Sequence, residues 1–147
     1  WVAHSGTPEV MQQQLQTTIE KIRHDLPKTE IVILGPVPNW KKPTGQNTFN
    51  YFALRGSVVP PFTSFGLLSS AQFFDGRIRD HWKEQPRVHY ISATDYLCDT
   101  EQGCLIRLPD QNFKPEAMAY VDDSHLSTAA ARFLVQKIAP QLEALLP

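Results

Sequence analysis

The sequence has little of what several protein classes require. Its 147 residues hold 14 Lys and Arg against 15 Asp and Glu, and this net charge of -1 gives no basic surface for nucleic acid. No apolar run approaches the length of a membrane span, and no charged-then-apolar leader is present. Internal repeats and low-complexity segments are also missing. With 41% hydrophobic residues, the composition predicts one globular domain over residues 1–147 with a genuine core.

Cysteine is scarce as well, since Cys98 and Cys104 are the only two. Metal sites usually place paired cysteines closer together and add further ligands, which are absent nearby. A turn containing Asp99 and Gly103 could bring the two Cα atoms within bridging distance, which favours a disulfide. Two free thiols, typical of a cytosolic protein, are the alternative. A disulfide would indicate an oxidising compartment, either a periplasm or the cell exterior.

Apolar periodicity predicts three amphipathic helices, over residues 7–26, 65–84 and 127–146. The first should bury one face, formed by Met11, Leu15, Ile19, Ile22 and Leu26. The second should direct Leu67, Phe74, Ile78 and Trp82 to one side, and the third Leu134, Ile138, Leu142 and Leu145. We expect Ser127 to cap the third helix, and Pro140 to kink or divide it.

Two short segments predict β-strands. Ile31–Leu34 is a continuous apolar run, typical of a parallel strand covered on both faces, and Val88–Ile91 is a second short strand. Residues 95–113 are expected to form a loop that carries the cysteines. Helix and buried strand alternate as in an α/β fold, but two strands do not form a stable sheet alone. Either the sheet has further strands that the apolar pattern does not indicate, or sequence that precedes Trp1 completes it. In the second case the chain would be a piece of a longer protein.

The segment with the clearest chemistry is Asp122-Asp123-Ser124-His125-Leu126-Ser127. An acid three residues before a histidine can curl back onto the imidazole, fix its tautomer and leave the other ring nitrogen to accept a proton. The alternative is a helix entry shaped by Asp123, Ser124 and Ser127, with His125 an ordinary loop residue. Its place directly before the last helix of an α/β fold favours the catalytic interpretation. A metal site is disfavoured because no second cluster of ligands completes the set.

No nucleophile is evident in the chain. Neither Gly-x-Ser-x-Gly nor Gly-Asp-Ser occurs, and the remaining candidates lack an activating frame: Ser5, Ser57, Ser64, Ser69, Ser70, Cys98 and Cys104. The nucleophile is therefore expected in sequence outside this chain. Trp40, with its neighbours Asn39 and Lys41, follows a strand end and could touch substrate, or could be a packed tryptophan in a solvated loop.

Four segments together resemble the SGNH hydrolase superfamily. They are Trp1 with its following turn, Ile31–Pro38, the loop from Tyr96 to Cys104, and Tyr120–Ser127. The resemblance is specifically to the periplasmic SGNH domain fused to a membrane acyltransferase (type 3) domain in proteins that O-acetylate bacterial surface polysaccharides.

This resemblance implies a flavodoxin-like three-layer α/β/α sandwich, of which residues 1–147 are the C-terminal portion. It makes Asp122 and His125 the catalytic acid and base, with the nucleophilic serine and the oxyanion-hole residues ahead of Trp1. The implied activity is a serine-dependent O-acyltransferase or carbohydrate esterase that uses no cofactor. Its implied partners are an acyl donor, a glycan acceptor and a membrane acyltransferase domain in the same polypeptide, at the periplasmic face of the inner membrane. A non-catalytic SGNH-like module that binds glycan or a partner subunit is the alternative.

Overall fold

The computed structural model describes residues 8–43, 50–52, 54–56, 58–109 and 117–145. In chain order its elements are α1 (Pro8–Asp25), β1 (Ile31–Leu34), β2 (Asn39–Trp40), β3 (Phe62–Thr63), β4 (Leu67–Leu68), α3 (Ser70–Trp82), β5 (Val88–Ile91), α4 (Thr94–Leu97), β6 (Cys98–Asp99), β7 (Gly103–Leu105) and α5 (Thr128–Glu143). None of the helices in these ranges is long and apolar enough to cross a bilayer.

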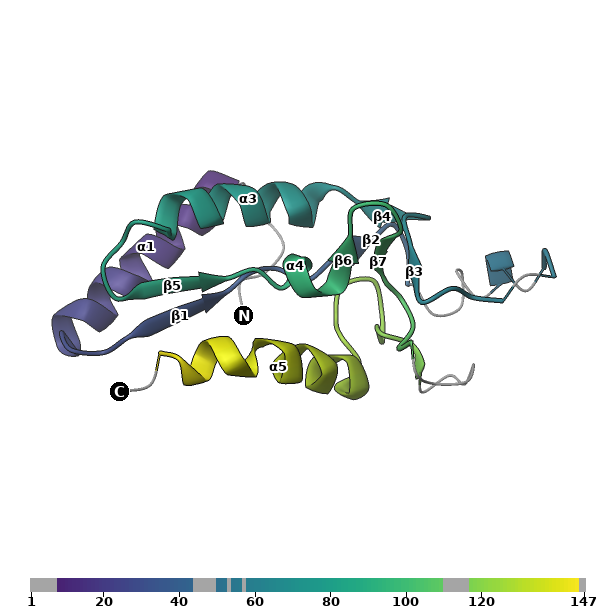
Figure 1. The fold of residues 1–147 in the computed structure, drawn as a ribbon. Helices are drawn as coiled ribbons and strands as arrows, with labels where there is room; N and C mark the ends of the chain where they lie inside the picture. Colours follow the sequence, from purple (N-terminus) through teal and green to yellow (C-terminus); the bar gives the residue numbers. More distant parts are fainter. Residues whose placement is uncertain (1–7, 44–49, 53, 57, 110–116, 146–147) are drawn as a thin grey trace.

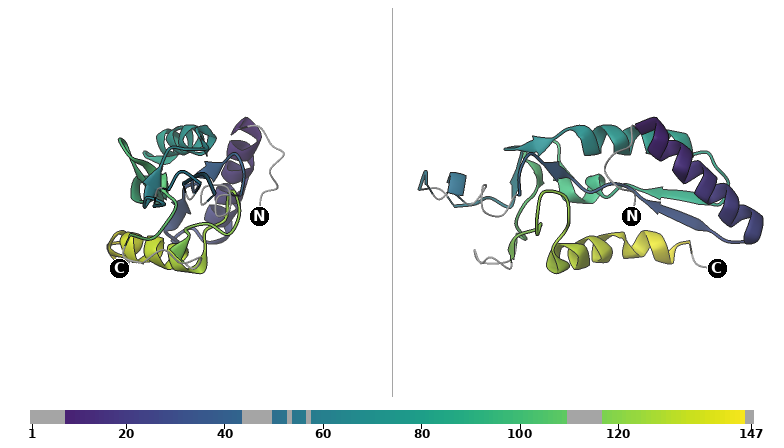
Figure 2. Two further views of the ribbon diagram at one scale, coloured as in Figure 1. Left: turned by 90° about the vertical axis from the view of Figure 1, so that its right-hand side faces the viewer. Right: turned by 180° about the vertical axis from the view of Figure 1, so that it is seen from behind.

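The molecule has three layers. Strands β1 and β5 pair in parallel as the middle layer, with Ile31 opposite Val88 and Leu34 opposite Ile91. Helices α1 and α3 lie on one side of these strands and α5 on the other, as the views in Figures 1 and 2 agree. The expected α/β class and the α/β/α layering are therefore confirmed.

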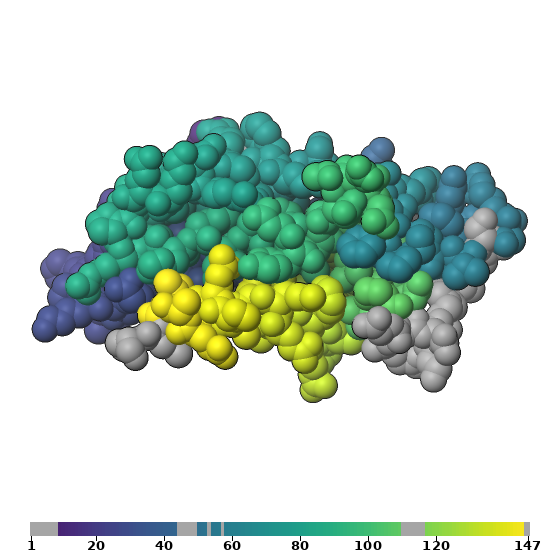
Figure 3. All heavy atoms as spheres, viewed as in Figure 1, coloured from purple at the N-terminus to yellow at the C-terminus, as the bar shows by residue number. Residues whose placement is uncertain are grey.

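Each side of the middle layer has its own core. Between the strands and helices α1 and α3, Ile19, Trp82 and Val88 are buried against one another. On the other side, Leu134 and Ile138 of α5 belong to a larger cluster that also reaches β2, α4 and β7. Figure 3 shows α5, in yellow, along the lower side of the molecule and directly against the teal and green residues above it.

Strand β1 is covered on one face only. Ile33 packs against the α1 and α3 core, whereas Val32 and Leu34 are 39% and 49% exposed. The expected cover on both faces is not present among the described residues, where the strand residue that joins the α5 core is Ile91 of β5. Leu26 is 58% exposed rather than buried, since α1 ends at Asp25 and the chain leaves the helix before this side chain.

Helix α3 begins later than predicted, at Ser70 instead of residue 65. Gly66 adopts a left-handed conformation, with φ of 75°, which interrupts a helix at this point. Leu67 then pairs with Trp40 in the antiparallel ladder of β2 and β4 instead of lining a helix face. Trp82, at the end of α3, is fully buried as predicted.

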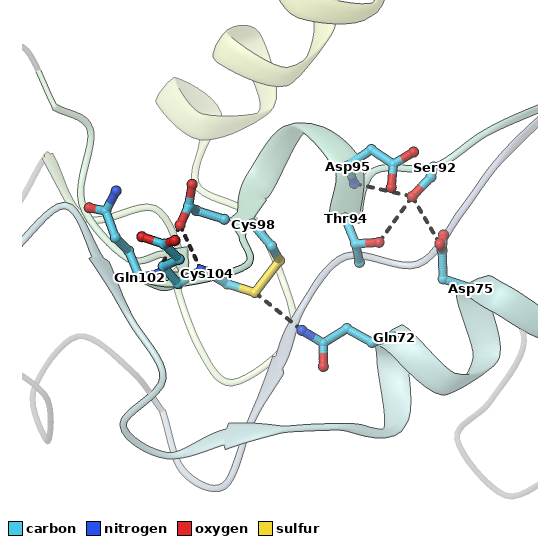
Figure 4. Close-up of a disulfide and its surroundings, with 10 residues drawn as sticks. Gln72, Asp75, Ser92, Thr94, Asp95, Cys98, Gln102 and Cys104 are labelled. Carbon is cyan, nitrogen blue, oxygen red and sulfur yellow. Dashed lines mark hydrogen bonds between the residues drawn. A yellow bond between two sulfur atoms is a disulfide. The ribbon is translucent and has the colours of Figure 1, made fainter.

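The segment predicted as a loop over residues 95–113 holds α4 and a β-hairpin. Strands β6 and β7 pair with Cys98 opposite Cys104, and a disulfide joins these two cysteines (Figure 4). At the hairpin turn, the Asp99 carboxylate accepts hydrogen bonds from the backbone N–H groups of Gln102 and Glu101, which lower its pKa. Gly103 has φ of 91°, and a Cβ there would lie 2.3 Å from the carbonyl carbon of Thr63 on β3. Only glycine fits this close approach.

Helix α5 begins as the sequence predicts. Ser127 is its N-cap, and the serine hydroxyl accepts a hydrogen bond from the backbone N–H of Ala130 at 3.2 Å. Pro140 does not divide the helix, which continues to Glu143. Because proline has no N–H, Pro140 leaves the carbonyl of Gln136 without its helical hydrogen bond, and the helix nevertheless runs on for one further turn.

Candidate acid–histidine site

Hydrogen bonds between backbone groups join the two ends of the loop that precedes α5. Tyr120 and Leu126 form an antiparallel bridge, and the N–H of Val121 donates to the carbonyl of His125 at 2.9 Å. The N–H of Ser127 donates to the carbonyl of Ala119 at 2.8 Å, which ties the start of α5 to the same segment. These bonds force residues 121–125 into a tight reversal, so that an acid and a histidine three positions apart face each other.

Within this loop, Asp122 uses both carboxylate oxygens. Its Oδ1 accepts the backbone N–H groups of Ser124 at 2.8 Å and of His125 at 2.7 Å. Its Oδ2 lies 2.7 Å from Nδ1 of His125. The N–H of Ser124 is the largest cause that lowers the pKa of Asp122 to about 2, and the backbone and ring of His125 lower it further, against the effect of burial.

The ionised carboxylate determines the tautomer of His125. Because Oδ2 of Asp122 is an acceptor only, the proton of a neutral imidazole resides on Nδ1, and Nε2 is the nitrogen that can act as a base. The side chains of His125 and Asp122 are 48% and 42% exposed, so reactants can reach them. A carboxylate bonded to Nδ1 of a histidine is also the arrangement between the acid and the base of serine-hydrolase triads.

Of the two adjacent acids, only Asp122 has a hydrogen bond to the imidazole among those described. Asp123 instead accepts the hydroxyl of Ser124 at 3.1 Å. The helix-entry interpretation applies to Ser127, which caps α5, and it coexists with the pairing of Asp122 and His125.

The loop is also anchored to the segment that follows β1. The backbone N–H of Trp40 donates to the carbonyl of Asp123 at 2.9 Å, and the N–H of Lys41 donates to the carbonyl of Gly66 at 2.8 Å. Trp40 is 3% exposed, so it is a packed tryptophan, the alternative to a residue that touches substrate. The acid–histidine loop therefore lies beyond the carboxyl end of β1, the edge where parallel α/β sheets hold their sites.

A second polar cluster, which the sequence did not predict, is centred on Asp75 of α3, and Figure 4 shows Asp75 with one of its partners, Ser92. Asp75 of α3 is 3% exposed and accepts hydrogen bonds from Tyr90 at 2.8 Å, Ser92 at 2.9 Å and Arg79 at 2.8 Å. Burial, and next the hydrogen bond to Asp75, raise the pKa of the Tyr90 hydroxyl. Gly35 completes the cluster, since a Cβ there would lie 2.3 Å from the Tyr90 oxygen. Asp75 and Arg79 are four positions apart on α3, but Tyr90, Ser92 and Gly35 come from other segments, so no local spacing marks the cluster as a whole.

The described residues supply no activated nucleophile at this loop. The two cysteines are joined to each other, and the Ser124 hydroxyl lies 3.5 Å from Nδ1, the ring nitrogen already bonded to Asp122. Ser5 and Ser57 lie outside the described residues. Over the same described ranges, no group of three or more His, Cys, Asp or Glu side chains could hold a metal ion.

A family model for the SGNH domain fused to AT3 domains matches residues 2–140 of the chain. The chain belongs to this SGNH family. The match covers the segments around the Asp122–His125 pair and the Cys98–Cys104 disulfide.

Two solved structures resemble this SGNH domain. The periplasmic domain of a lipopolysaccharide acetyltransferase from Salmonella ser. Paratyphi A is 27% identical, with a TM-score of 0.81 over 95% of this chain and 52% of that one. A putative platelet activating factor from Streptococcus pneumonia is 18% identical, with a TM-score of 0.59 over 92% of this chain and 51% of that one. The second likeness concerns the fold alone. The chain thus spans about half the length of each structure, and no curated protein matches it in sequence.

Proposed function

We propose that residues 1–147 form the C-terminal portion of an SGNH domain that transfers an acetyl group to bacterial surface polysaccharide or removes it. The single observation that carries the proposal is the 2.7 Å contact between Oδ2 of Asp122 and Nδ1 of His125. It is supported by the family to which the chain belongs and by the resemblance to an acetyltransferase periplasmic domain.

In this proposal, Nε2 of His125 removes the hydroxyl proton of a serine as the serine oxygen attacks the ester carbonyl of the acyl donor. The ionised Asp122 orients the ring and stabilises the imidazolium that forms. The imidazolium then gives its proton to the departing alkoxide, which leaves an acyl-serine. In the second half, Nε2 deprotonates a sugar hydroxyl, whose oxygen attacks the acyl carbonyl, and the serine leaves with the proton returned. Water in place of the sugar gives hydrolysis.

The serine and the oxyanion-hole donors belong, in this proposal, to residues that precede Trp1. Two observations support it: the face of β1 formed by Val32 and Leu34 is uncovered, and each similar structure is about twice as long as this chain. An upstream Gly-Asp-Ser about 60–80 residues before Trp1 fits the length that a strand-helix-strand start requires.

The proposed location is the periplasmic face of the bacterial inner membrane. The fusion to AT3 domains in the family's description supports a membrane acyltransferase domain in the same polypeptide. The Cys98–Cys104 disulfide supports an oxidising compartment.

The experiment measures p-nitrophenyl acetate hydrolysis by the complete domain in three variants. His125→Ala removes the general base and should lower kcat by about 10²–10⁴-fold, and Asp122→Asn should cost less because the base survives. Asp123→Asn is the matched control, since its carboxylate accepts from Ser124 and not from the imidazole. Circular dichroism checks that each variant is folded.

Unchanged turnover in His125→Ala would remove this residue from the mechanism. A larger loss in Asp123→Asn than in Asp122→Asn would reverse the assignment of the acid. A natural domain with no Gly-Asp-Ser upstream would instead support a non-catalytic module that binds glycan or a partner subunit.

A further inference from the structure

We propose that Trp40 is a positioning residue that holds the Asp122–His125 loop in its reactive geometry at the carboxyl end of β1. The inference rests on the proposed function, because it assigns a role in the chemistry of that same site. Trp40 touches neither substrate nor the imidazole in the proposal and acts through the loop.

The first link is through the backbone. The N–H of Trp40 donates to the carbonyl of Asp123 at 2.9 Å, at the middle of the loop and directly beside Asp122. The same residue is paired with Leu67 of β4, and the next N–H, of Lys41, donates to Gly66. Strand β2 is therefore held from its other side and presents a fixed donor to the loop.

The second link is through the side chain. The indole of Trp40 meets the ring of Tyr120 edge to face, with centroids 5.6 Å apart and planes at 75°. Tyr120 is the residue whose bridge to Leu126 closes the loop, and both rings are 3% exposed. Trp40 thus contacts the loop at its closing pair as well as at its centre. Two separate contacts to a reversal this short restrict both its position and its tilt.

The side chains of Trp40 and Tyr120 are packed against each other in the core beneath the loop. The indole nitrogen of Trp40 and the hydroxyl of Tyr120 are both buried. Burial raises the pKa of Tyr120, and the indole, which acts on the hydroxyl as a hydrogen-bond partner, lowers this pKa by less. A phenylalanine at either place would fill the core without the buried polar atom.

The test uses the complete domain and compares two buried tryptophans. Trp82 is fully buried in the other core, on α3, and its indole nitrogen has no hydrogen-bond partner among the described residues. Trp40→Ala and Trp82→Ala therefore remove the same side chain from similar surroundings. We expect Trp40→Ala to lower kcat by about 10–100-fold with KM unchanged, because small displacements of a catalytic group are costly. Trp82→Ala should leave kcat within about threefold, and Trp40→Phe should restore it by restoring the ring contact.

A second measurement separates positioning from general destabilisation. The N–H groups of Ser124 and His125 help to lower the pKa of Asp122 to about 2, so a loosened loop should raise it toward its ordinary value of 3.8. Carboxyl ¹³C NMR should detect this rise in Trp40→Ala and not in Trp82→Ala. Trp40→Leu and Trp82→Leu serve the same comparison if either alanine variant fails to fold.

Equal losses of kcat in the two tryptophan variants, with the pKa of Asp122 unchanged, would overturn the positioning role. His125→Ala is measured in parallel to keep the two proposals apart. If His125→Ala retains full turnover, the proposed function fails, while the NMR titration of Asp122 still decides whether Trp40 positions the loop.

Discussion

Removal of one hydroxyl from the buried cluster around Asp75 should destabilise the protein measurably. In Tyr90→Phe, Oδ1 of Asp75 loses the donor that lies 2.8 Å away. The bonds from Arg79 and Ser92 both go to the other oxygen, Oδ2. Oδ1 would then be a buried carboxylate oxygen without a hydrogen bond from the described residues, since Asp75 is 3% exposed.

The expected loss is the value of a hydrogen bond to a buried charge. Such bonds contribute about 1.5–3 kcal/mol to the free energy of unfolding. We expect a loss toward the upper end of this range, because Oδ1 of Asp75 would be left buried without a donor. Tyr96→Phe is the matched control, because its hydroxyl donates to Gln141 at 2.9 Å in an exposed, uncharged pair. That substitution should cost about 1 kcal/mol or less.

Urea unfolding of the complete domain measures both variants, with the slope of the transition checked for constancy. The loss in Tyr90→Phe should shrink as the pH rises above 10, the ordinary pKa of tyrosine. The folded protein keeps the Tyr90 proton because burial raises its pKa, whereas the unfolded chain releases it, so the wild type loses stability. Equal losses in Tyr90→Phe and Tyr96→Phe would refute the argument that the buried carboxylate sets the magnitude.

Further predictions concern other single sites. Gly35→Ala would place a Cβ 2.3 Å from the Tyr90 oxygen and should cost about 1–3 kcal/mol by thermal unfolding, and an unchanged Tm would contradict this close approach. Reduction should add about 2 Da to the intact mass, one hydrogen each for Cys98 and Cys104, and should remove roughly 2 kcal/mol of stability; no mass change would mean that the thiols are free. Because the folded pKa of Asp122 is lowered to about 2, its ionisation stabilises the fold fully above pH 3.8, and this contribution should vanish as the pH falls toward 2. The difference in the free energy of unfolding between the wild type and Asp122→Asn should therefore become smaller as the pH is lowered through this range.

The elements that the sequence predicts well are those with long, periodic or continuous apolar patterns. Helix α1, strands β1 and β5 and helix α5 all lie close to the predicted residues. The wrong predictions concern residues whose burial depends on elements that are distant in the sequence, which a local pattern does not encode. Leu34 lies in a continuous apolar run and is therefore predicted to be buried, yet its side chain is 49% exposed because no element of the described chain covers that face of β1. Strands of two or three residues, such as β2 and β7, are too short for alternation to appear in the sequence.

The acid–histidine pair could be recognised from sequence because the hydrogen bonds of the Asp122 carboxylate to Ser124 and His125 join residues within three positions of one another. Asp122, Ser124 and His125 need only a tight reversal to meet, and the residue types and their spacing already specify it. The residues that hold this reversal in place are distant in sequence. Trp40 reaches Asp123 and Tyr120 only because β2 is paired with β4 beyond the end of β1.

The sequence by itself therefore determined the α/β class, the main helices and strands and the identity of the pair Asp122 and His125. Only the tertiary structure decided that Asp75 collects three donors, that Trp40 is buried against Tyr120 and that one face of β1 is open. The physical reason is the range of the interactions. Periodicity and short loops are encoded within a few residues, whereas contacts between separate elements depend on how the layers pack.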